Sequence, residues 1–327
     1  MTDALGTAAA PNIASAAQPL PLYIVFNTAS GSGDGERNQR TMSEILREAG
    51  RDHEFLLVTD PRKVDEYAKR AAQLAVQNRG AVVVAGGDGT IRAVAQATLS
   101  TGRPFGIIPQ GTFNYTSRAQ GIPLPTEDAT RALLESTPKR MQVGLVNDHV
   151  FLVNASLGLY PQLLQDRESF KRHFGRYRAV AFASAVSTIL RGNGFLSLEL
   201  EHDRVREKVH TPSLFVGNNA LQLERTGLPE AEVIGQDQLA GVVLRESSLH
   251  GLLGLMLRGV LGKLGSADSL RRFTFNRLSV RPRLRGVRKL KVALDGEVHW
   301  MKPPLVFRVA DEPLWLLTPD AERDAGA

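Results

Sequence analysis

The sequence predicts two domains, an N-terminal α/β domain with a parallel sheet and a β-rich C-terminal domain that forms a sandwich or barrel. Three observations lead to this fold class. The chain has 327 residues, more than one compact domain usually contains. Short apolar runs alternate with helical stretches in the first half, the order that produces a parallel sheet covered by helices. From about residue 140 short strands dominate, which favours an antiparallel arrangement.

The first half should contain four strands of one sheet. Their apolar runs cover residues 22–26, 54–58, 81–85 and 105–109. The helices expected between them cover residues 36–49, a segment from Pro61 to about Asn78, and a segment that ends near Leu99. Since ligands of such sheets bind beyond the carboxyl ends of the strands, the loops at that edge are the candidate binding region.

The second half should be a domain of short strands. They are predicted at residues 151–154, 195–200, 213–216, 240–244, 278–281, 290–294, 305–309 and 314–317, with helices at about 169–190 and 249–264. The predicted domains are therefore 20–139 and 140–318, between a disordered lead-in at 1–19 and a tail at 319–327. The sequence leaves open whether the last strands pack back on the first domain.

Composition limits the functions open to the chain. Hydrophobic residues make up 43% and charged residues 23%, as in folded globular proteins. The chain has no cysteine, which excludes disulfides and cysteine-bound zinc, and its seven histidines lack metal-ligand spacing. The formal net charge of +6 suits a nucleotide, an anionic membrane or nucleic acid. Nucleic acid is not expected, because the basic residues lack the interleaved aromatic residues of a stacking platform.

The N-terminal residues carry no recognisable targeting signal. The first nineteen are Ala-rich with Asp3 as the only charge, so they lack the basic region and apolar core of a secretory signal. No apolar run approaches the roughly 18 residues that cross a bilayer. The predicted location is the cytoplasm, and peripheral contact with the inner face of the membrane is a further hypothesis.

The first Gly-rich loop, from Asn27 to Gly35, lies between a predicted strand and a predicted helix. Its glycines allow backbone N–H groups to converge on an anion, and the N-terminus of the next helix adds a favourable dipole. The loop lacks the Gly-Lys-Ser/Thr ending of a P-loop and does not fit a dinucleotide fingerprint. A flexible strand-to-helix turn is the alternative.

Two further loops follow the third and fourth strands. The glycines of Gly86-Gly87-Asp88-Gly89-Thr90 permit close approach of phosphates, and Asp88 could hold a metal or a ribose hydroxyl or could simply cap the helix. In Pro109-Gln110-Gly111-Thr112-Phe113-Asn114, the Asn114 amide could bond a nucleotide or serve only a turn. Because all three loops follow strands of one parallel sheet, we expect them at one edge.

The order Asn-x-x-Ser-Gly, Gly-Gly-Asp-Gly-Thr and Pro-x-Gly-Thr-x-Asn resembles the diacylglycerol kinase catalytic family. That family includes bacterial lipid kinases and sphingosine and ceramide kinases, and it is more distantly related to NAD kinases. The resemblance covers about residues 22–317 and continues through Asn154 to Leu159, Val216 to Asn219, Gly235 to Leu239 and Leu294 to Glu297. It implies an enzyme that uses ATP and Mg²⁺ to phosphorylate a lipid hydroxyl.

The resemblance implies a nucleotide site in the loops of the first domain. In the family, the Gly-Gly-Asp-Gly-Thr segment lies over the phosphates of ATP, and a threonine that contacts the nucleotide in bacterial members matches Thr59. The implied nucleotide-binding residues are Asn27, Ser30, Gly31, Thr59, Gly86, Gly87, Asp88, Gly89, Thr90, Ile91, Arg92, Thr112 and Asn114.

The resemblance also implies a metal site and a catalytic pair. Asp237 matches an aspartate that binds a structural magnesium, with the main-chain carbonyls of Ile234 and Leu239 as helpers, and oxygen ligands suit such a hard cation. Asp295 and Glu297 match a general base and its supporting acid, whose roles could be exchanged. The alternative is a hairpin turn in which the Asp-Gly pair serves only the backbone.

Several positions depart from the family pattern. Tyr115 and Gln142 stand where Asp is usual, Gln238 replaces a Gly, and Arg92 replaces an Asn. The two lost carboxylates affect how many metals the site could hold. The alternatives are a nucleotide kinase of the NAD-kinase type and a non-catalytic relative that binds a nucleotide or a lipid. The Asn-x-x-Ser-Gly start and the long β-rich half favour the lipid kinase over the NAD kinase.

Basic residues gather in two segments of the second half. Arg271 to Lys291 contains nine basic and no acidic residues, and Lys171 to Leu190 begins basic and then becomes apolar. Either segment could contact an anionic membrane, whereas a solvated strand face and a core helix are the alternatives. The expected partners are a lipid substrate and, by this hypothesis, an anionic membrane, and a homodimer stays open.

Overall fold

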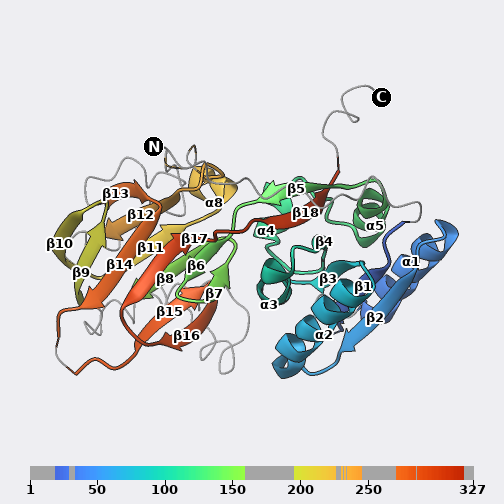
Figure 1. The fold of residues 1–327 in the computed structure, drawn as a ribbon, viewed down its shortest axis with the longest axis horizontal. Helices are drawn as coiled ribbons and strands as arrows, with labels where there is room; N and C mark the ends of the chain where they lie inside the picture. Colours follow the sequence, from blue (N-terminus) through green and yellow to red (C-terminus); the bar gives the residue numbers. More distant parts are fainter. Residues whose placement is uncertain are drawn as a thin grey trace, which may run out of the picture. The chain divides into compact units, whose positions relative to one another are not determined.

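The structure is a computed structural model that describes residues 19–28, 34–158, 195–225, 230, 232, 234–244, 270–284 and 286–319 (Figure 1). The chain divides into two compact units. Unit 1 contains residues 1–143 and 310–327, and unit 2 contains residues 144–309. The predicted helices at 169–190 and 249–264 and nearly all of the predicted lead-in and tail lie outside the described residues.

Unit 1 is built on a six-stranded sheet, sheet A, with the strand order β2-β1-β3-β4-β18-β5. Its strands are β1 (Leu22–Asn27), β2 (His53–Val58), β3 (Ala81–Gly86), β4 (Pro104–Pro109), β5 (Thr137–Met141) and β18 (Leu314–Thr318). All neighbouring pairs are parallel except β18 with β5. Every residue of β1, β3 and β4 is buried, which explains their continuous apolar runs.

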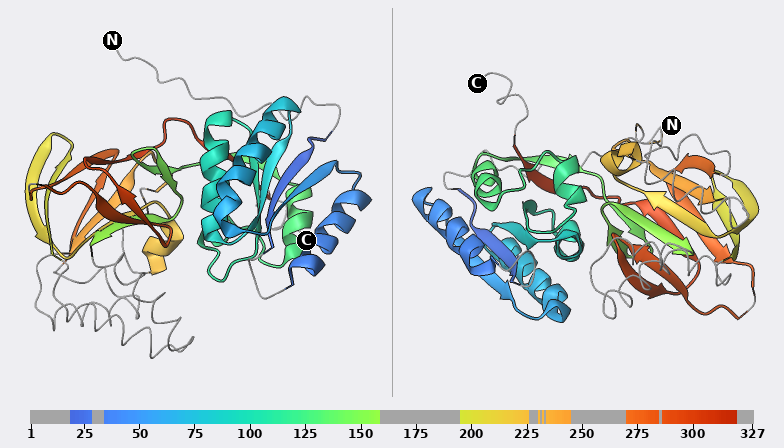
Figure 2. Two further views of the ribbon diagram at one scale, coloured as in Figure 1. Left: turned by 90° about the horizontal axis from the view of Figure 1, so that it is seen from below. Right: turned by 180° about the vertical axis from the view of Figure 1, so that it is seen from behind.

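Helices cover both faces of sheet A. They are α1 (Gly35–Glu48), α2 (Val64–Gln77), α3 (Asp88–Thr98), α4 (Tyr115–Ala119) and α5 (Thr126–Leu134), with 3₁₀ turns at Pro61–Lys63 and Leu99–Thr101. Helix α1 contacts α5 on one face, and α2 contacts α3 on the other (Figure 2). The connection from β1 to β2 runs toward one edge of the sheet, whereas the connections from β2 to β3 and from β3 to β4 run toward the other edge. Because such crossovers are right-handed, the helices of the two directions lie on opposite faces. This arrangement leaves the carboxyl ends of β1, β2, β3 and β4 at one edge.

Unit 2 contains two antiparallel six-stranded sheets. Sheet B has the order β10-β9-β14-β17-β6-β7, and sheet C has the order β13-β12-β11-β8-β15-β16. Sheet B comprises β6 (Gly144–Val146), β7 (His149–Phe151), β9 (Leu196–His202), β10 (Val205–Thr211), β14 (Arg277–Pro282) and β17 (Leu305–Val309). Sheet C comprises β8 (Asn154–Gly158), β11 (Ser213–Gly217), β12 (Leu239–Leu244), β13 (Leu270–Phe275), β15 (Leu290–Leu294) and β16 (Glu297–Met301). The short helix α8 (Ala220–Arg225) follows β11.

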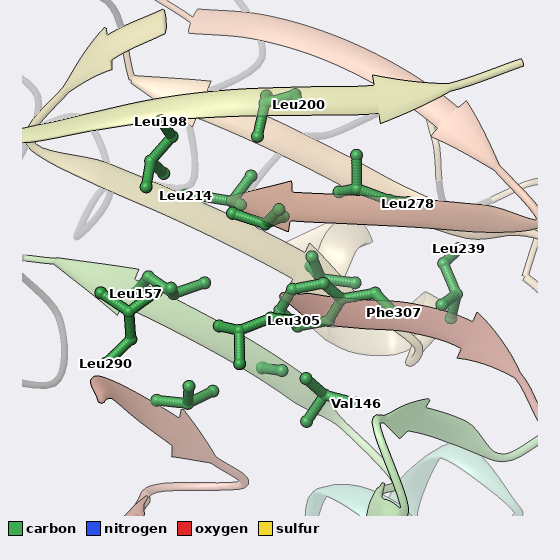
Figure 3. Close-up of a cluster of buried hydrophobic side chains, with 14 of the residues drawn as sticks. Val146, Leu157, Leu198, Leu200, Leu214, Leu239, Leu278, Leu290, Leu305 and Phe307 are labelled. Atoms are coloured by element: carbon green, nitrogen blue, oxygen red, sulfur yellow. The ribbon is translucent and has the colours of Figure 1, made fainter. Parts of the chain in front are cut away.

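One apolar core joins sheets B and C. Alternate residues of each strand point into it, as the twofold repeat of a strand requires. Sheet B contributes Leu198, Leu200, Leu278, Leu305 and Phe307, among others, and sheet C contributes Leu157, Leu214, Leu239 and Leu290 (Figure 3). The opposite face of sheet C is therefore turned away from this core, which matters for the site described below.

The strand predicted at residues 151–154 is wrong. Strand β7 ends at Phe151 and β8 begins at Asn154, so Leu152 and Val153 form the turn between them. Both side chains are buried, which explains why their apolar character resembled a strand. The prediction also missed α4, α5, α8, β5, β6, β8, β10, β13 and β16, which are short or carry polar residues on one face. No described helix is long and apolar enough to span a bilayer.

Candidate functional site

The register of sheet A brings the carboxyl ends of four strands level. Asn27 of β1 lies opposite Val58 of β2, and Phe26 lies opposite Ala85 of β3. Gly86 at the end of β3 lies opposite Pro109 at the end of β4. The three Gly-rich loops therefore start at one edge, as their positions after parallel strands predicted.

Side-chain hydrogen bonds connect the start of the first loop to its neighbours. The Asn27 amide nitrogen Nδ2 donates to the hydroxyl Oγ1 of Thr90 at 2.9 Å, and both residues are buried. The Thr28 hydroxyl donates to the carbonyl oxygen of Val58 at 3.0 Å. Ser30 and Gly31 lie outside the described residues, and Thr59 is exposed beyond the end of β2.

The second and third loops pack against each other through glycines. The backbone N–H of Gln110 donates to the carbonyl of Gly86 at 2.8 Å, and the backbones of Gly87 and Gly111 approach closely. Asn114 has φ of 50° and ψ of 44°, and its side chain closes the third loop. Its Oδ1 accepts from Gly111 N at 2.9 Å, and its Nδ2 donates to Gly111 O at 2.8 Å. The amide thus orders this loop, and Thr112 beside it is exposed.

The glycine contact gives a prediction with a matched control. A Cβ at Gly111 would lie 2.8 Å from the Cα of Gly87, whereas a Cβ at Gly87 would lie 3.4 Å from its nearest neighbour. We expect Gly111→Ala to lower the free energy of unfolding by about 1–3 kcal/mol, the usual cost of forcing atoms into a packed region. Gly87→Ala should change it much less. Urea unfolding of both variants tests this prediction. Equal losses of unfolding free energy would show that the close approach of Gly87 and Gly111 does not make Gly111 more sensitive to an added Cβ.

Asp88 stands in the first turn of α3, facing the start of α4. Burial raises the pKa of Asp88, and hydrogen bonds from the backbone N–H groups of Thr116, Asn114 and Tyr115 partly offset this effect. Its Oδ1 is buried and has no hydrogen-bond partner among the described residues. A buried carboxylate oxygen without a partner is costly unless a ligand satisfies it, and a hard cation prefers such an oxygen. Asp88 therefore fits a site for Mg²⁺ bound with a nucleotide.

The remaining predicted residues of the second loop lie on α3. Gly89, Thr90, Ile91 and Arg92 belong to its first two turns, and the backbone N–H of Ile91 donates to the carbonyl of Gly87 at 2.9 Å. Arg92 is buried although it is charged. Its position in the second turn of α3 places its backbone close to the Gly86–Thr90 loop.

Two features at this edge were not predicted. The Gln110 side chain is 8% exposed, and neither amide atom has a hydrogen-bond partner among the described residues. No signal in the sequence separates this glutamine from an ordinary loop residue. Tyr115, which replaces the usual Asp, stacks on Phe113 with ring centroids 5.7 Å apart, so an aromatic pair stands where the family pattern has a carboxylate.

A second cluster of candidate residues lies at one end of sheet C in unit 2, around Asp295. Its carboxylate accepts three backbone N–H groups: Oδ2 from Leu152 at 2.8 Å, and Oδ1 from Val153 at 2.8 Å and Asn154 at 2.9 Å. The Asp295 N–H donates to the carbonyl of Asn154 at 2.9 Å. These bonds explain why Leu152 and Val153 turn instead of continuing a strand.

The predicted catalytic pair occupies the β15–β16 hairpin. Asp295 has φ of 47° and Gly296 has φ of 91°, as a two-residue hairpin turn requires. Glu297 begins β16, and its Oε2 lies 4.0 Å from His299 Nε2. Half of its side chain is exposed. The Asp-Gly pair thus serves the turn, and the Asp295 carboxylate is held rigidly while Glu297 reaches solvent.

Three of the segments that carry the family resemblance, those containing Asn154, Asn218 and Asp295, meet in this cluster. The Asn154 amide donates to Gln222 Oε1 at 3.0 Å, and the Asn218 amide donates to the carbonyl of Leu152 at 3.1 Å. Asn219 Oδ1 accepts from the backbone of Gln222 at 3.0 Å, which caps α8. Asn154 Oδ1 and the Ser156 hydroxyl are buried and have no hydrogen-bond partner among the described residues. This end of sheet C is therefore a polar cluster with unsatisfied groups.

The predicted metal turn lies beside this cluster, at the start of β12. Gly217 pairs with Ala240, which brings the end of β11 next to residues 234–239. Asp237 is exposed with φ of 59°, and its carbonyl accepts from Asn276 Nδ2 at 2.6 Å. The described residues contain no group of three His, Asp or Glu side chains that could hold a metal. Mg²⁺ here would depend on one carboxylate, the carbonyls of Ile234 and Leu239, and water, a donor set that suits it.

Known proteins resemble both the sequence and the fold. The family described as the diacylglycerol kinase catalytic domain matches residues 21–146. The chain is 29% identical to protein sll0036 of Synechocystis, over 70% of this chain and 55% of that protein. It is 29% identical to a diacylglycerol kinase of Staphylococcus saprophyticus (45% and 48%) and 38% identical to "Probable lipid kinase YegS-like" of Pseudomonas aeruginosa (39% and 42%). The chain thus spans about half the length of the curated relatives it matches.

A solved structure supports the predicted fold class. A diacylglycerol kinase of Bacillus anthracis matches with a TM-score of 0.66 and 18% sequence identity, over 92% of this chain and 97% of that chain. At this identity the match concerns the fold alone. The prediction of an α/β domain with a mostly parallel sheet and a β-rich second domain is confirmed.

Proposed function

Since residues 21–146 belong to the diacylglycerol kinase catalytic domain family, we propose that this chain is an ATP-dependent lipid kinase. It transfers the γ-phosphoryl group of ATP to a lipid hydroxyl. The observation that carries this proposal is the edge of sheet A, where the Gly86–Thr90 loop, the Gly111–Asn114 loop and Asn27 lie level and in contact. Phosphoryl transfer depends mainly on positioning and electrostatic stabilisation, which such an edge can supply.

The loops of unit 1 hold the nucleotide in this proposal. Backbone N–H groups of Gly86 to Thr90 face the phosphates at the N-terminus of α3, where the helix dipole favours negative charge. Asp88 Oδ1 would hold Mg²⁺, which offsets the charge that develops on the phosphate oxygens. Asn114 orders the third loop, and Arg92 adds a positive charge.

The polar cluster of unit 2 receives the acceptor hydroxyl. The acceptor oxygen forms a bond to the γ-phosphorus while the bond to the leaving ADP oxygen breaks, and the hydroxyl proton passes to Asp295. Oδ1 of Asp295 accepts the backbone N–H groups of Val153 and Asn154 and Oδ2 accepts that of Leu152, so the carboxylate that takes the proton is fixed in position. Glu297 assists from the same hairpin. Mg²⁺ at Asp237 would stabilise the turn before β12.

The outer face of sheet C favours a lipid over a nucleotide as the acceptor. Phe215, Ser156, Ala293 and Val298 lie side by side in register across this face. Leu223 of α8 packs against the same side of the sheet. Apart from Ser156, which belongs to the polar cluster, these side chains are apolar. Such a surface suits an acyl chain whose hydroxyl end lies at Asp295.

Two observations favour the non-catalytic alternative. Tyr115 replaces a carboxylate, and the Asp295 carboxylate already serves the backbone of residues 152–154. A relative that binds a nucleotide or a lipid without transferring phosphate would tolerate both features.

The test combines the purified chain with Mg²⁺, γ-labelled ATP and one of three acceptors. The acceptors are a total lipid extract, NAD, or water alone. Label in the organic phase supports the lipid kinase, and label on NAD supports a nucleotide kinase. Binding of ATP measured by calorimetry without transfer to any acceptor would overturn catalysis and favour the binding relative.

A further inference from the structure

The structure divides the basic run Arg271 to Lys291 into two parts. In the strands, three of the basic side chains have acidic partners. Arg271 contacts Glu207, Arg272 lies 3.5 Å from Glu230, and Arg281 lies 4.0 Å from Glu201. These arginines stabilise the sheets and leave little net charge for a partner.

The loop between β14 and β15 differs. Arg283, Arg288 and Lys289 are exposed and form no ion pair with any described residue. No acidic residue occurs between residues 282 and 294. Between the basic residues stands Leu284, which is 65% exposed, more than any other large hydrophobic side chain in the described part of the chain. A single exposed leucine is ordinary on a protein surface, and it becomes informative here only together with the exposed aromatic residues beside this loop.

Two exposed aromatic residues flank this loop. The backbone N–H of Arg283 donates to Ser197 O at 2.8 Å, which places the loop beside the start of β9 and Phe195. Phe195 is 37% exposed and stacks on His210. The other end of the loop leads into β15, where Lys291 pairs with Trp300 of β16. Trp300 is 57% exposed, with Lys291 Nζ 5.1 Å from its ring centroid.

We propose that this end of unit 2 docks on an anionic lipid surface. The docking end is defined by Phe195, Arg283, Leu284, Arg288, Lys289 and Trp300. Basic groups near such a surface are attracted to it, while Trp, Phe and Leu side chains enter the boundary between headgroups and acyl chains. The proposal goes beyond the phosphoryl-transfer reaction, because it concerns the surface to which the protein binds and does not require turnover.

The positive charge of the docking end indicates which partner binds there. A second copy docked through the same patch would bring the unpaired basic residues of both copies together, and like charges in contact are unfavourable. An anionic membrane supplies the complementary charge and an apolar interior for Leu284 and Trp300. The geometry is also consistent with the polar cluster: β15 runs from Leu290 at the docking end to Leu294 beside Asp295, about 13 Å at the usual rise per residue.

The test measures sedimentation of the full chain with vesicles, without ATP. One set contains phosphatidylcholine alone, and the other contains 30% phosphatidylserine, and neither lipid carries a free glycerol hydroxyl. Binding should require the anionic lipid and fall with salt. The double variant Arg288→Gln/Lys289→Gln should bind about 30-fold more weakly, at about 1 kcal/mol for each basic residue lost. Leu284→Ser should weaken binding at every salt concentration.

The control removes two exposed basic residues elsewhere, Lys69→Gln/Arg70→Gln on α2. It should bind like the parent protein. Absent binding at low salt, equal binding by parent and double variant, or an equal loss in the control would each overturn the proposal. Light scattering that shows self-association lost in the double variant would assign the surface to a second copy instead. Turnover on a detergent-dispersed acceptor should be unchanged in these variants, which separates this result from a failure of the proposed function.

Discussion

Replacing Asp295 with Asn is expected to lower kcat by about 10²–10⁴-fold on an accepted lipid, the usual cost of losing a general base. The same change should lower the melting temperature. An amide offers one oxygen where the carboxylate has two, so its NH₂ group would face at least one of the backbone N–H donors from Leu152, Val153 and Asn154. A donor facing a donor inside the protein leaves both unsatisfied.

The variant Glu297→Gln distinguishes the catalytic role proposed for this hairpin from its structural role. Glu297 is half exposed, so its loss should reduce kcat and leave the melting temperature near that of the parent. Glu312→Gln, at an exposed turn before β18, is the matched control and should change neither quantity. ATP affinity is measured alongside by calorimetry, since both variants should keep it. If Asp295→Asn loses stability but keeps turnover, Asp295 serves only the turn and the base lies elsewhere.

The interior of the fold was predictable where a strand is uniformly buried or strictly alternating. The pattern predicts β15 and β17 with the bounds that the structure has, because each is an apolar run bounded by polar turns. Strand β10 was missed because its sequence is polar at most positions, and only its pairing with β9 makes it a strand. Pairing depends on residues distant in the sequence, which local patterns do not report.

The candidate site was predictable as a set of loops but not as a set of contacts. Parallel strands fix the edge at which the Gly-rich loops start, so their grouping followed from the strand order alone. The partners of the polar side chains did not follow. Asn114 bonds its own loop, and Asp295 bonds the turn at Leu152 and Val153, about 140 residues earlier in the chain. Apolar side chains at that turn gave no hint of a carboxylate acceptor.

Asp88→Asn should weaken Mg-ATP binding by about 10- to 150-fold, the equivalent of about 1.5–3 kcal/mol for a lost charged contact. The fold should survive, because the amide oxygen can still accept an N–H from the start of α4. Calorimetric titration with Mg-ATP measures the effect. Unchanged affinity in a folded Asp88→Asn variant would remove Asp88 from the nucleotide site.

The stability of the same variant should depend on pH in a defined direction. Burial raises the pKa of Asp88 above its unfolded value, so its contribution to stability is complete below the unfolded pKa and is lost as pH rises through the folded pKa. Asn does not titrate, so the stability of Asp88→Asn relative to the parent should increase from pH 3.5 to pH 7. Asp60→Asn gives the opposite sign, because the hydrogen bonds from Arg62 lower the pKa of Asp60 and stabilise its charged form. Urea unfolding across this pH range measures both trends, and a flat or reversed trend for Asp88→Asn would mean that its carboxylate is not buried in solution.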